Sequence, residues 1–429
     1  MPKSMFGIQG LNMWNILLVG VFAGWLASRR REGLTWDMPR HINALLLLYL
    51  GVILVGFLRA LLDRSHLENY TVLEMISEEL INTIKWVVPG LLLFDGCRSR
   101  KRLQWAVVSI LGMYFLLAAQ VVARVPWQSA LGGSEERIDY IRAKLCSDIG
   151  YSRCDMSTFL AGASWAMLAA IPLARHKKFR FLLLGAAGIG AFGQALTGGR
   201  AGYVAWMATG LVLCIVKWRK YLLLAPAVPL VLMIAFPGVI QRTLEGFRQT
   251  DAAGQTVVDD YLVTSGRTLI WPHVVDRISE SSACGYGRLA MRRTGLADYL
   301  EGQYGEGEGF PHPHNMYLEI LLDNGIIGAI PILLFFGLIV VYAGRLFRAA
   351  DPWCSAVGGL ALSMVLAQLF AGIGSQHFYP EESKVGMWAA VFLMLRVSVI
   401  RARVSASATA GLANARLHCV PAAGLEATS

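Results

Sequence analysis

The sequence predicts an all-α polytopic membrane protein with about 11–12 transmembrane helices and a large, partly helical loop outside the membrane. Of its 429 residues, 55% are hydrophobic and only 16% are charged, and the mean hydropathy is +0.50. Soluble domains carry roughly 25% charged residues, so the composition excludes an ordinary soluble enzyme. The apolar residues also lie in uninterrupted blocks close to the ~20 residues that cross a bilayer as a helix.

These blocks define eleven predicted spans. They lie near residues 12–28, 42–62, 80–95, 104–124, 157–174, 181–197, 201–216, 221–240, 325–344, 354–374 and 385–400. Alternate connections are strongly basic and are expected to face the cytoplasm, whereas acidic residues gather in the intervening connections. The basic connections lie at 29–31, 98–102, 175–180, 217–220, 345–348 and 401–403. The net charge of +10 therefore reflects membrane topology, and no nucleic-acid partner is expected.

The pattern divides the chain into four parts. Residues 1–240 are predicted as N-terminal transmembrane helices, 241–324 as a periplasmic loop that ends in the candidate catalytic motif described below, and 325–403 as C-terminal transmembrane helices. Residues 404–429 lack periodicity and are predicted to be a disordered cytoplasmic tail. The long connection is far above the usual loop length, which favours a functional role. Its apolar run from Leu269 to Ile278 predicts a short amphipathic helix after Ser265-Gly266.

The end of this loop carries the first candidate for chemistry. His312-Pro313-His314-Asn315 precedes an apolar run, and Pro313 suits the first turn of a helix that Gly325 would end. Free N–H groups at a helix N-terminus favour an anion, and an imidazole there can act as a general base near neutral pH. The alternatives are that both histidines only cap the helix, or that they bind zinc. No further ligand stands at a convincing spacing, so no metal site is predicted.

Three arginines outside the membrane are candidate phosphate ligands. Arg200 lies in a tight turn between two spans, Arg267 precedes the predicted amphipathic helix, and Arg288 stands between glycines in the loop. Guanidinium groups bind phosphate bidentately, and an arginine near the bilayer surface is costly unless it has a partner or a ligand. The alternative roles are contact with lipid headgroups or salt bridges to acidic residues.

Two cysteines are a candidate disulfide. Cys146 and Cys154 lie eight residues apart in one external connection, a spacing that allows a bond in an oxidising compartment. Two free thiols are the alternative.

Three motifs resemble, in order, the O-antigen ligase family. They are Thr197-Gly198-Gly199-Arg200-Ala201-Gly202, then Ser265-Gly266-Arg267 with Trp271, and then Pro313-His314-Asn315-Met316-Tyr317-Leu318-Glu319 with Gly325. The resemblance covers roughly residues 155–400. It implies a bacterial inner-membrane glycosyltransferase that transfers a glycan from undecaprenyl diphosphate to a hydroxyl of lipid A–core. It further implies an inverting, metal-independent reaction at the periplasmic face, without a cofactor.

The resemblance also assigns residues. His314 matches the essential histidine, Arg200 and Arg267 match the arginines that serve the diphosphate, and Arg288 is a further candidate there. His312, Asn315 and Tyr317 are expected to support the site. The expected partners are the lipid-linked glycan donor, the lipid A–core acceptor and membrane lipids. The same superfamily contains O-antigen polymerases and protein O-oligosaccharyltransferases, so the acceptor stays open. A transporter is less favoured because the predicted spans have almost uncharged centres.

Overall fold

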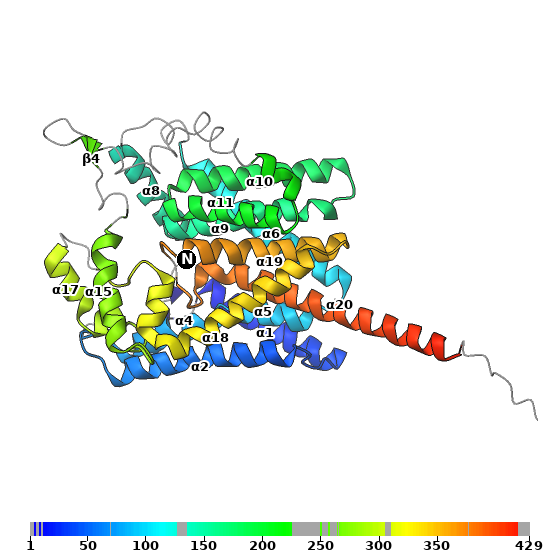
Figure 1. Ribbon diagram of the computed structural model, residues 1–429, viewed down its shortest axis with the longest axis horizontal. Coiled ribbons are helices and arrows are strands. Elements are labelled where there is room, and N and C mark those ends of the chain that lie inside the picture. Colours follow the sequence, from blue (N-terminus) through cyan, green and yellow to red (C-terminus); the bar gives the residue numbers. More distant parts are fainter. Residues whose placement is uncertain are drawn as a thin grey trace, which may run out of the picture.

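The protein is a bundle of long helices in a computed structural model (Figure 1). The structure describes residues 4–5, 8–9, 12–68, 70–126, 135–224, 249–250, 256–257, 264, 266–304, 310–375 and 377–418. The α-helices are α1 (Met13–Glu32), α2 (Arg40–Leu62), α3 (Val72–Met75), α4 (Asn82–Lys85), α5 (Val88–Gly96), α6 (Arg100–Arg124), α8 (Glu135–Ile149), α9 (Arg153–Ala170), α10 (Lys177–Thr197), α11 (Arg200–Val216), α15 (Arg267–Glu280), α16 (Ala290–Arg293), α17 (Leu296–Tyr304), α18 (Met316–Phe347), α19 (Pro352–Ala371) and α20 (Val385–His418).

Short elements complete the described chain. They are the π-helix η1 (Ile76–Ile81), the 3-10 helices η2 (Ile171–Leu173), η3 (Arg219–Leu224) and η4 (Glu382–Lys384), and the strand pairs β1 (Ser4–Met5) with β2 (Ile8–Gln9) and β3 (Gln249–Thr250) with β4 (Thr256–Val257).

The predicted all-α membrane fold is confirmed. Within the described ranges, seven helices are long and apolar enough to cross a membrane, and each coincides with a predicted span. They include α2, α6, α10, α18 and α19, together with the helices that begin at Arg153 and Glu382. The predicted spans near 12–28, 80–95 and 201–216 are also helical, the second as a broken helix, whereas the span near 221–240 lies largely outside the described residues.

Helices α9 and α19 form the centre of the bundle. Helices α10 and α11 lie on one side of this pair, and α18, α2 and α20 lie on the other (Figure 1). Glycines let the central helices approach closely: a Cβ at Gly162 would lie 3.0 Å from the Cα of Met364, and one at Gly359 would lie 2.5 Å from the Cβ of Ala169. Small residues at such contacts are the usual basis of helix association in membranes, because lipid provides no hydrophobic driving force.

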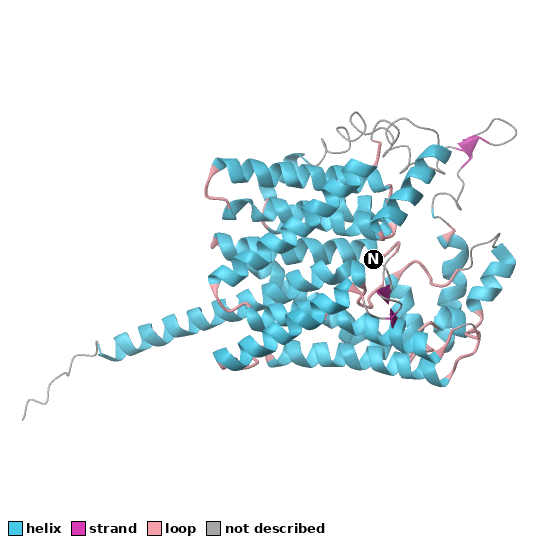
Figure 2. Cartoon of the chain, turned by 180° about the vertical axis from the view of Figure 1, so that it is seen from behind, coloured by secondary structure: helices cyan, strands magenta, loops and turns pink. Residues whose placement is uncertain are grey.

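The long loop contributes a small cap at one end of the bundle. Helices α15 and α17 lie at the same end as α8, and α20 projects from the opposite end (Figures 1 and 2). The cap has its own apolar core, and the expected amphipathic helix is present as α15. The core comprises Ile270, Val274, Ala290, Met291, Leu296, Leu300 and, from α18, Leu322.

A kink in α18 joins the cap to the bundle. Gly325 has φ 60° and ψ −168°, so the helix breaks where the sequence predicts a glycine C-cap. The backbone groups freed by the kink bond to the cap, because Ile326 N–H donates to Ser282 O at 2.9 Å and Tyr286 N–H donates to Leu322 O at 2.9 Å. The cap is therefore held in fixed relation to the residues just before the kink.

Two boundary predictions need correction. The helix expected to begin at Pro313 begins at Met316, because the Asn315 side chain caps it by accepting bonds from the N–H groups of Tyr317 and Leu318. The tail expected to be disordered from residue 404 is helical through His418, since this Ala-rich segment has high helix propensity. Residues 419–429 of that tail lie outside the described residues.

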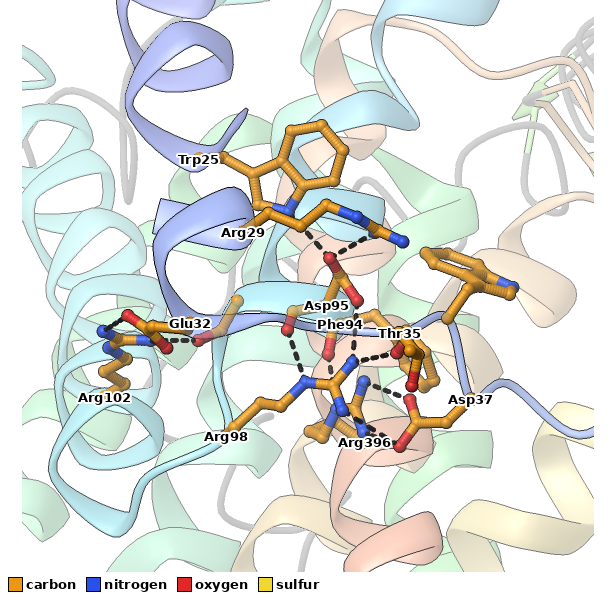
Figure 3. Close-up of polar contacts among 12 residues, drawn as sticks. Trp25, Arg29, Glu32, Thr35, Asp37, Phe94, Asp95, Arg98, Arg102 and Arg396 are labelled. Atoms are coloured by element: carbon orange, nitrogen blue, oxygen red, sulfur yellow. Dashed lines mark hydrogen bonds and ion pairs between the residues drawn. The ribbon is translucent and has the colours of Figure 1, made fainter. Parts of the chain in front are cut away.

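A polar cluster ties helices together at the end from which α20 projects. Figure 3 shows its contacts. The fully buried Asp95 carboxylate accepts hydrogen bonds from Arg29 at 2.6 Å and from Arg98 at 2.8 Å. Arg396 of α20 is paired with Asp37 at 2.7 and 2.8 Å. The cluster joins α1, α5, α20 and the segment before α2, and it lies among residues that the charge pattern places at the cytoplasmic side.

Candidate active site

The turn between α10 and α11 places Arg200 at the first residue of a helix. Gly198 ends α10 with φ 72°, and Gly199 caps α11. The Ser157 hydroxyl of α9 donates to Gly199 O at 3.0 Å, and a Cβ at Gly202 would lie 1.9 Å from that hydroxyl oxygen. Only glycine permits this approach, so the Gly-Gly-Arg-Ala-Gly motif fixes the Arg200 backbone against α9.

Helix α8 brings another arginine to the same turn. A Cβ at Gly198 would lie 2.4 Å from the guanidinium of Arg142, so this side chain lies directly over the turn that precedes Arg200. The sequence reasoning missed Arg142. Its only signal was its place in an external connection, since nothing local indicates which part of the bundle α8 contacts.

Arg267 lies beside this turn. It is the first residue of α15, after Gly266 with φ 75°, and its guanidinium donates to Thr264 O at 2.8 Å and to Gly374 O. A Cβ at Gly374 would lie 3.6 Å from Ala201 Cβ and 3.8 Å from Arg267 Nη2, so Gly374 separates the two arginine segments. Burial lowers the pKa of Arg267, and the charge of Arg200 lowers it further.

Three histidines lie together on the neighbouring segments. The ring centroids of His312 and His314 are 4.1 Å apart, and those of His312 and His377 are 5.1 Å apart, both edge to face. His314 has φ 50°, a left-handed conformation that is uncommon outside glycine and often marks a functional site. The chain thus brings His314 next to His312 and to the sequence-distant His377.

The histidines differ in electrostatic environment. Burial lowers the pKa of His314 to about 4, and the charges of Arg267 and His377 lower it further. Burial and the two neighbouring histidines lower the pKa of His312 to about 3. Burial also opposes a charge on His377, but the Glu319 carboxylate outweighs it and raises the pKa of His377 above its usual value. His314 is therefore neutral at physiological pH and lies within the field of Arg267.

A comparison with known protein families matches part of this region. Residues 181–333 match the model of a family described as O-antigen ligase. This segment is an O-antigen ligase family domain. No curated protein matches the chain. The predicted family is thus confirmed, and the domain contains Arg200, Arg267 and His314, whereas His377 follows it. The chain is a multi-pass membrane protein that contains this domain.

His377 lies in none of the three sequence motifs, yet it is central to the geometry around the O-antigen ligase domain. Its Nδ1 lies 2.5 Å from Glu319 Oε2 of α18, and its backbone oxygen accepts hydrogen bonds from Lys384 and Gln368. No sequence signal could pair His377 with Glu319, since 58 residues separate them.

The α18 N-terminus does not offer the anion site that the sequence suggested. Met316 N–H donates to Gly372 O at 2.8 Å, and the Asn315 side-chain oxygen accepts from Tyr317 N–H at 2.9 Å and from Leu318 N–H at 3.2 Å. These bonds occupy the N–H groups that would otherwise face an anion. The Tyr317 hydroxyl donates to Leu369 O at 2.9 Å, so Asn315 and Tyr317 hold the start of α18 in place.

Arg288 lies in the domain but belongs to a different network from Arg200 and Arg267. Its Nε donates to Glu79 at 2.8 Å, and its Nη1 lies 3.6 Å from Glu319 and 3.7 Å from Asp323. The guanidinium also stacks 3.7 Å from the Tyr379 ring. Three carboxylates already satisfy this cation, so the structure does not favour the predicted diphosphate role for Arg288 and favours a role beneath Glu319 instead.

Cys146 and Cys154 are free thiols in the structure, so the predicted disulfide is not formed here. Burial raises the pKa of Cys146, and the nearby Cys154 raises it further, against a hydrogen bond from the Arg153 backbone. Among the residues that the structure describes, no group of three or more histidine, cysteine and carboxylate side chains is placed to hold a metal ion.

Proposed function

We propose that the protein is an O-antigen ligase that transfers a glycan from undecaprenyl diphosphate to a sugar hydroxyl of lipid A–core. The reaction takes place at the periplasmic face of the inner membrane. In this proposal, the cap end of the bundle lies on the periplasmic side. It needs no metal and no cofactor, because the diphosphate is already an activated leaving group.

The observation that carries this proposal is the environment of Arg267. Its Nε is buried and has no hydrogen-bond partner within the described ranges, although its Nη1 and Nη2 donate to carbonyl oxygens. A buried N–H without a partner is costly, and it is satisfied when an acceptor binds. A phosphate oxygen is a suitable acceptor, since guanidinium binds it with charge-assisted hydrogen bonds. Arg200 adds a second positive charge beside it.

In the proposed reaction, His314 removes the proton from the acceptor hydroxyl. The hydroxyl oxygen attacks the anomeric carbon from the side opposite the diphosphate, the bond to the phosphate oxygen breaks, and the anomeric centre inverts. Arg200 and Arg267 stabilise the negative charge that the leaving diphosphate gains. The low pKa of His314 in the free protein keeps its ring nitrogen unprotonated, and the bound diphosphate raises that pKa by offsetting the charge of Arg267.

Polymerisation and protein glycosylation use the same donor chemistry and differ in acceptor. We favour lipid A–core because the matching family model is the ligase model. A transfer assay therefore offers the purified protein a lipid-linked glycan together with lipid A–core, with a second lipid-linked glycan, or with an acceptor protein.

The test of the mechanism is the variant His314→Ala in this assay. Loss of a general base lowers the rate by about 10²–10⁴-fold, so transfer should fall by that factor in a protein that is folded and inserted. His312→Ala should lower the rate less than His314→Ala does, because His312 does not remove the proton from the acceptor hydroxyl. Near-normal transfer by His314→Ala would refute the assignment of the base. A large effect of zinc or of a chelator on the rate would refute the metal-free mechanism.

A further inference from the structure

We propose that His377, backed by Glu319, is the final acceptor of the proton that His314 removes, and that the proton reaches it through His312. This inference rests on the proposed function, because it assigns the destination of a proton released in that reaction. The inference gives His377 and Glu319 a role in turnover. Glu319 lies in the third motif and in the family domain, whereas His377 lies in neither.

The geometry places the groups of this path next to one another. His314 contacts His312 with ring centroids 4.1 Å apart, His312 contacts His377 at 5.1 Å, and His377 Nδ1 lies 2.5 Å from a Glu319 oxygen. The path runs from the segment before α18, across to the segment after α19, and back to α18. Glu319 is 8% exposed, so the carboxylate at its end is largely withdrawn from water.

The electrostatics give the path a direction. A positive charge on His314 is opposed by burial and by Arg267, and one on His312 is opposed by burial and by the other two histidines. On His377 a positive charge is stabilised by the hydrogen-bonded Glu319 carboxylate. The proton is therefore more stable at the end of the path than at the ring that first accepts it.

The proposed proton transfers balance at each stage. The acceptor hydroxyl gives its proton to a neutral His314 as its oxygen bonds to the anomeric carbon and the electron pair of the broken bond leaves with the diphosphate. The His314 imidazolium passes a proton to neutral His312, which passes one to neutral His377. The products are a glycoside, a lipid diphosphate and a His377 imidazolium paired with Glu319, and the proton then leaves to solvent before the next turnover.

The charges that face His377 come from four segments. Glu319 approaches from α18, His312 from the segment before that helix, and Glu381 and Lys384 from the turn and the 3-10 helix that follow His377. Glu381 raises the pKa of His377 and Lys384 lowers it. Arg288 lies behind Glu319, at 3.6 Å, and limits how strongly the carboxylate acts on His377.

The test is the pH dependence of kcat/KM for the full chain in proteoliposomes, with lipid-linked glycan and lipid A–core. His377 must be neutral to accept the proton, so the rate should fall on the acid side below the His377 pKa, which lies above 6.5. His314 and His312 do not titrate in that range, because their pKa values are about 4 and about 3. Glu319→Gln removes the main group that raises the His377 pKa. The acid limb, which is the pH range over which kcat/KM falls on the acid side, should therefore move to lower pH by about one pH unit or more.

Matched variants separate this role from a structural one. Glu381→Gln should shift the acid-side fall in kcat/KM in the same direction but by less, since Glu381 makes no hydrogen bond to the His377 ring. Glu280→Gln, at the far end of α15, should leave the acid-side fall at the wild-type pH. His377→Asn should lower the rate by about 10²-fold at all pH values and abolish the limb. A histidine NMR titration in nanodiscs, which needs no turnover, should show a His377 midpoint above 6.5 that falls in Glu319→Gln.

The outcomes distinguish the two proposals. If Glu319→Gln lowers the rate equally at every pH without moving the limb, or if His377→Asn keeps the wild-type profile, the proton path is wrong while the proposed function stands. If His314→Ala retains transfer, the proposed function itself fails, whatever His377 does.

Discussion

The Arg288 guanidinium stacks on the Tyr379 ring with its central carbon 3.7 Å from the ring centroid. The same cation faces the carboxylates of Glu79, Glu319 and Asp323. Burial alone would lower the pKa of Arg288, but these negative groups outweigh it and raise the pKa above its usual value. Arg288 therefore holds together carboxylates from two helices beneath the site, and its removal would leave them buried with no countercharge.

The first prediction follows from this. Breaking a buried ion pair by removing one partner costs about 3–5 kcal/mol, so Arg288→Met should lower the melting temperature strongly in detergent. Arg277→Met is the control, because its exposed pair with Glu280 contributes at most about 1 kcal/mol. A stable Arg288→Met protein that has lost only donor binding would instead restore the diphosphate role.

The second prediction concerns Arg267. Lysine keeps the charge but cannot donate to Thr264 O, Gly374 O and a phosphate together. A hydrogen bond to a charged group contributes about 1.5–3 kcal/mol, so Arg267→Lys should lower kcat/KM for the donor by about ten- to hundred-fold. Arg277→Lys on the same helix should have no effect. Equal rates for wild type and Arg267→Lys would remove Arg267 from the donor site.

Arg267 and Arg288 also show which features of the site could be predicted from the sequence and which could not. The spans were predictable because about twenty apolar residues suffice to identify each one. Arg200, Arg267 and His314 could be chosen as candidates because each lies in a short local motif. The partners of Arg288 were not, since Glu79 lies 209 residues away. The pairing of His377 with Glu319 was missed for the same reason: tertiary packing creates it.

Helix boundaries show the complementary limit. Pro313 and Asn315 both suit a helix start, and only the cap geometry, in which Asn315 accepts from two N–H groups, decides between them. The π-helix and the break before α5 likewise replace a span that reads as continuous in the sequence. Local patterns predicted the membrane spans and α15, whereas the exact helix ends and the break before α5 depend on geometry that the pattern does not carry.

The third prediction tests orientation with a native probe. Cys284 in the cap is exposed, whereas the other described cysteines are buried or partly buried. A membrane-impermeant thiol reagent should label Cys284 in cells with a permeabilised outer membrane. With Cys284→Ser as background, Glu301→Cys in α17 should be labelled and Lys178→Cys at the other end of the bundle should not. The reverse pattern would invert the proposed topology.

The fourth prediction concerns acid stability. The folded pKa of His312 is lowered to about 3 by burial and by His314 and His377, against 6.5 in an unfolded chain. Between these values the unfolded chain binds a proton that the folded protein excludes, so this group makes stability fall as pH falls below about 6.5. The melting temperature of His312→Gln should therefore fall less between pH 7 and pH 5 than that of the wild type. His176→Gln, at an exposed position, is the control, and an unchanged acid loss in His312→Gln would contradict the argument.

The last prediction concerns the end opposite the cap, where Arg396 and Asp37 are 1% and 9% exposed. Asp37 also accepts from Arg98 and Arg403, so Arg396→Met leaves the carboxylate with partners, whereas Asp37→Asn leaves the buried Arg396 without its countercharge. Asp37→Asn should cost about 3–5 kcal/mol of stability and Arg396→Met less. The double variant should be more stable than Asp37→Asn, because it removes the unpaired cation.

A double-mutant cycle on thermal unfolding measures this coupling. Glu32→Gln is the matched control, since Glu32 forms a more exposed pair with Arg102 and should change stability much less than Asp37→Asn. If the Asp37 and Arg396 effects simply add, the two residues are not coupled. The ties between α20 and the segment before α2 would then depend on apolar packing and on the stacking of Arg396 over Phe94, at 4.0 Å, rather than on charge.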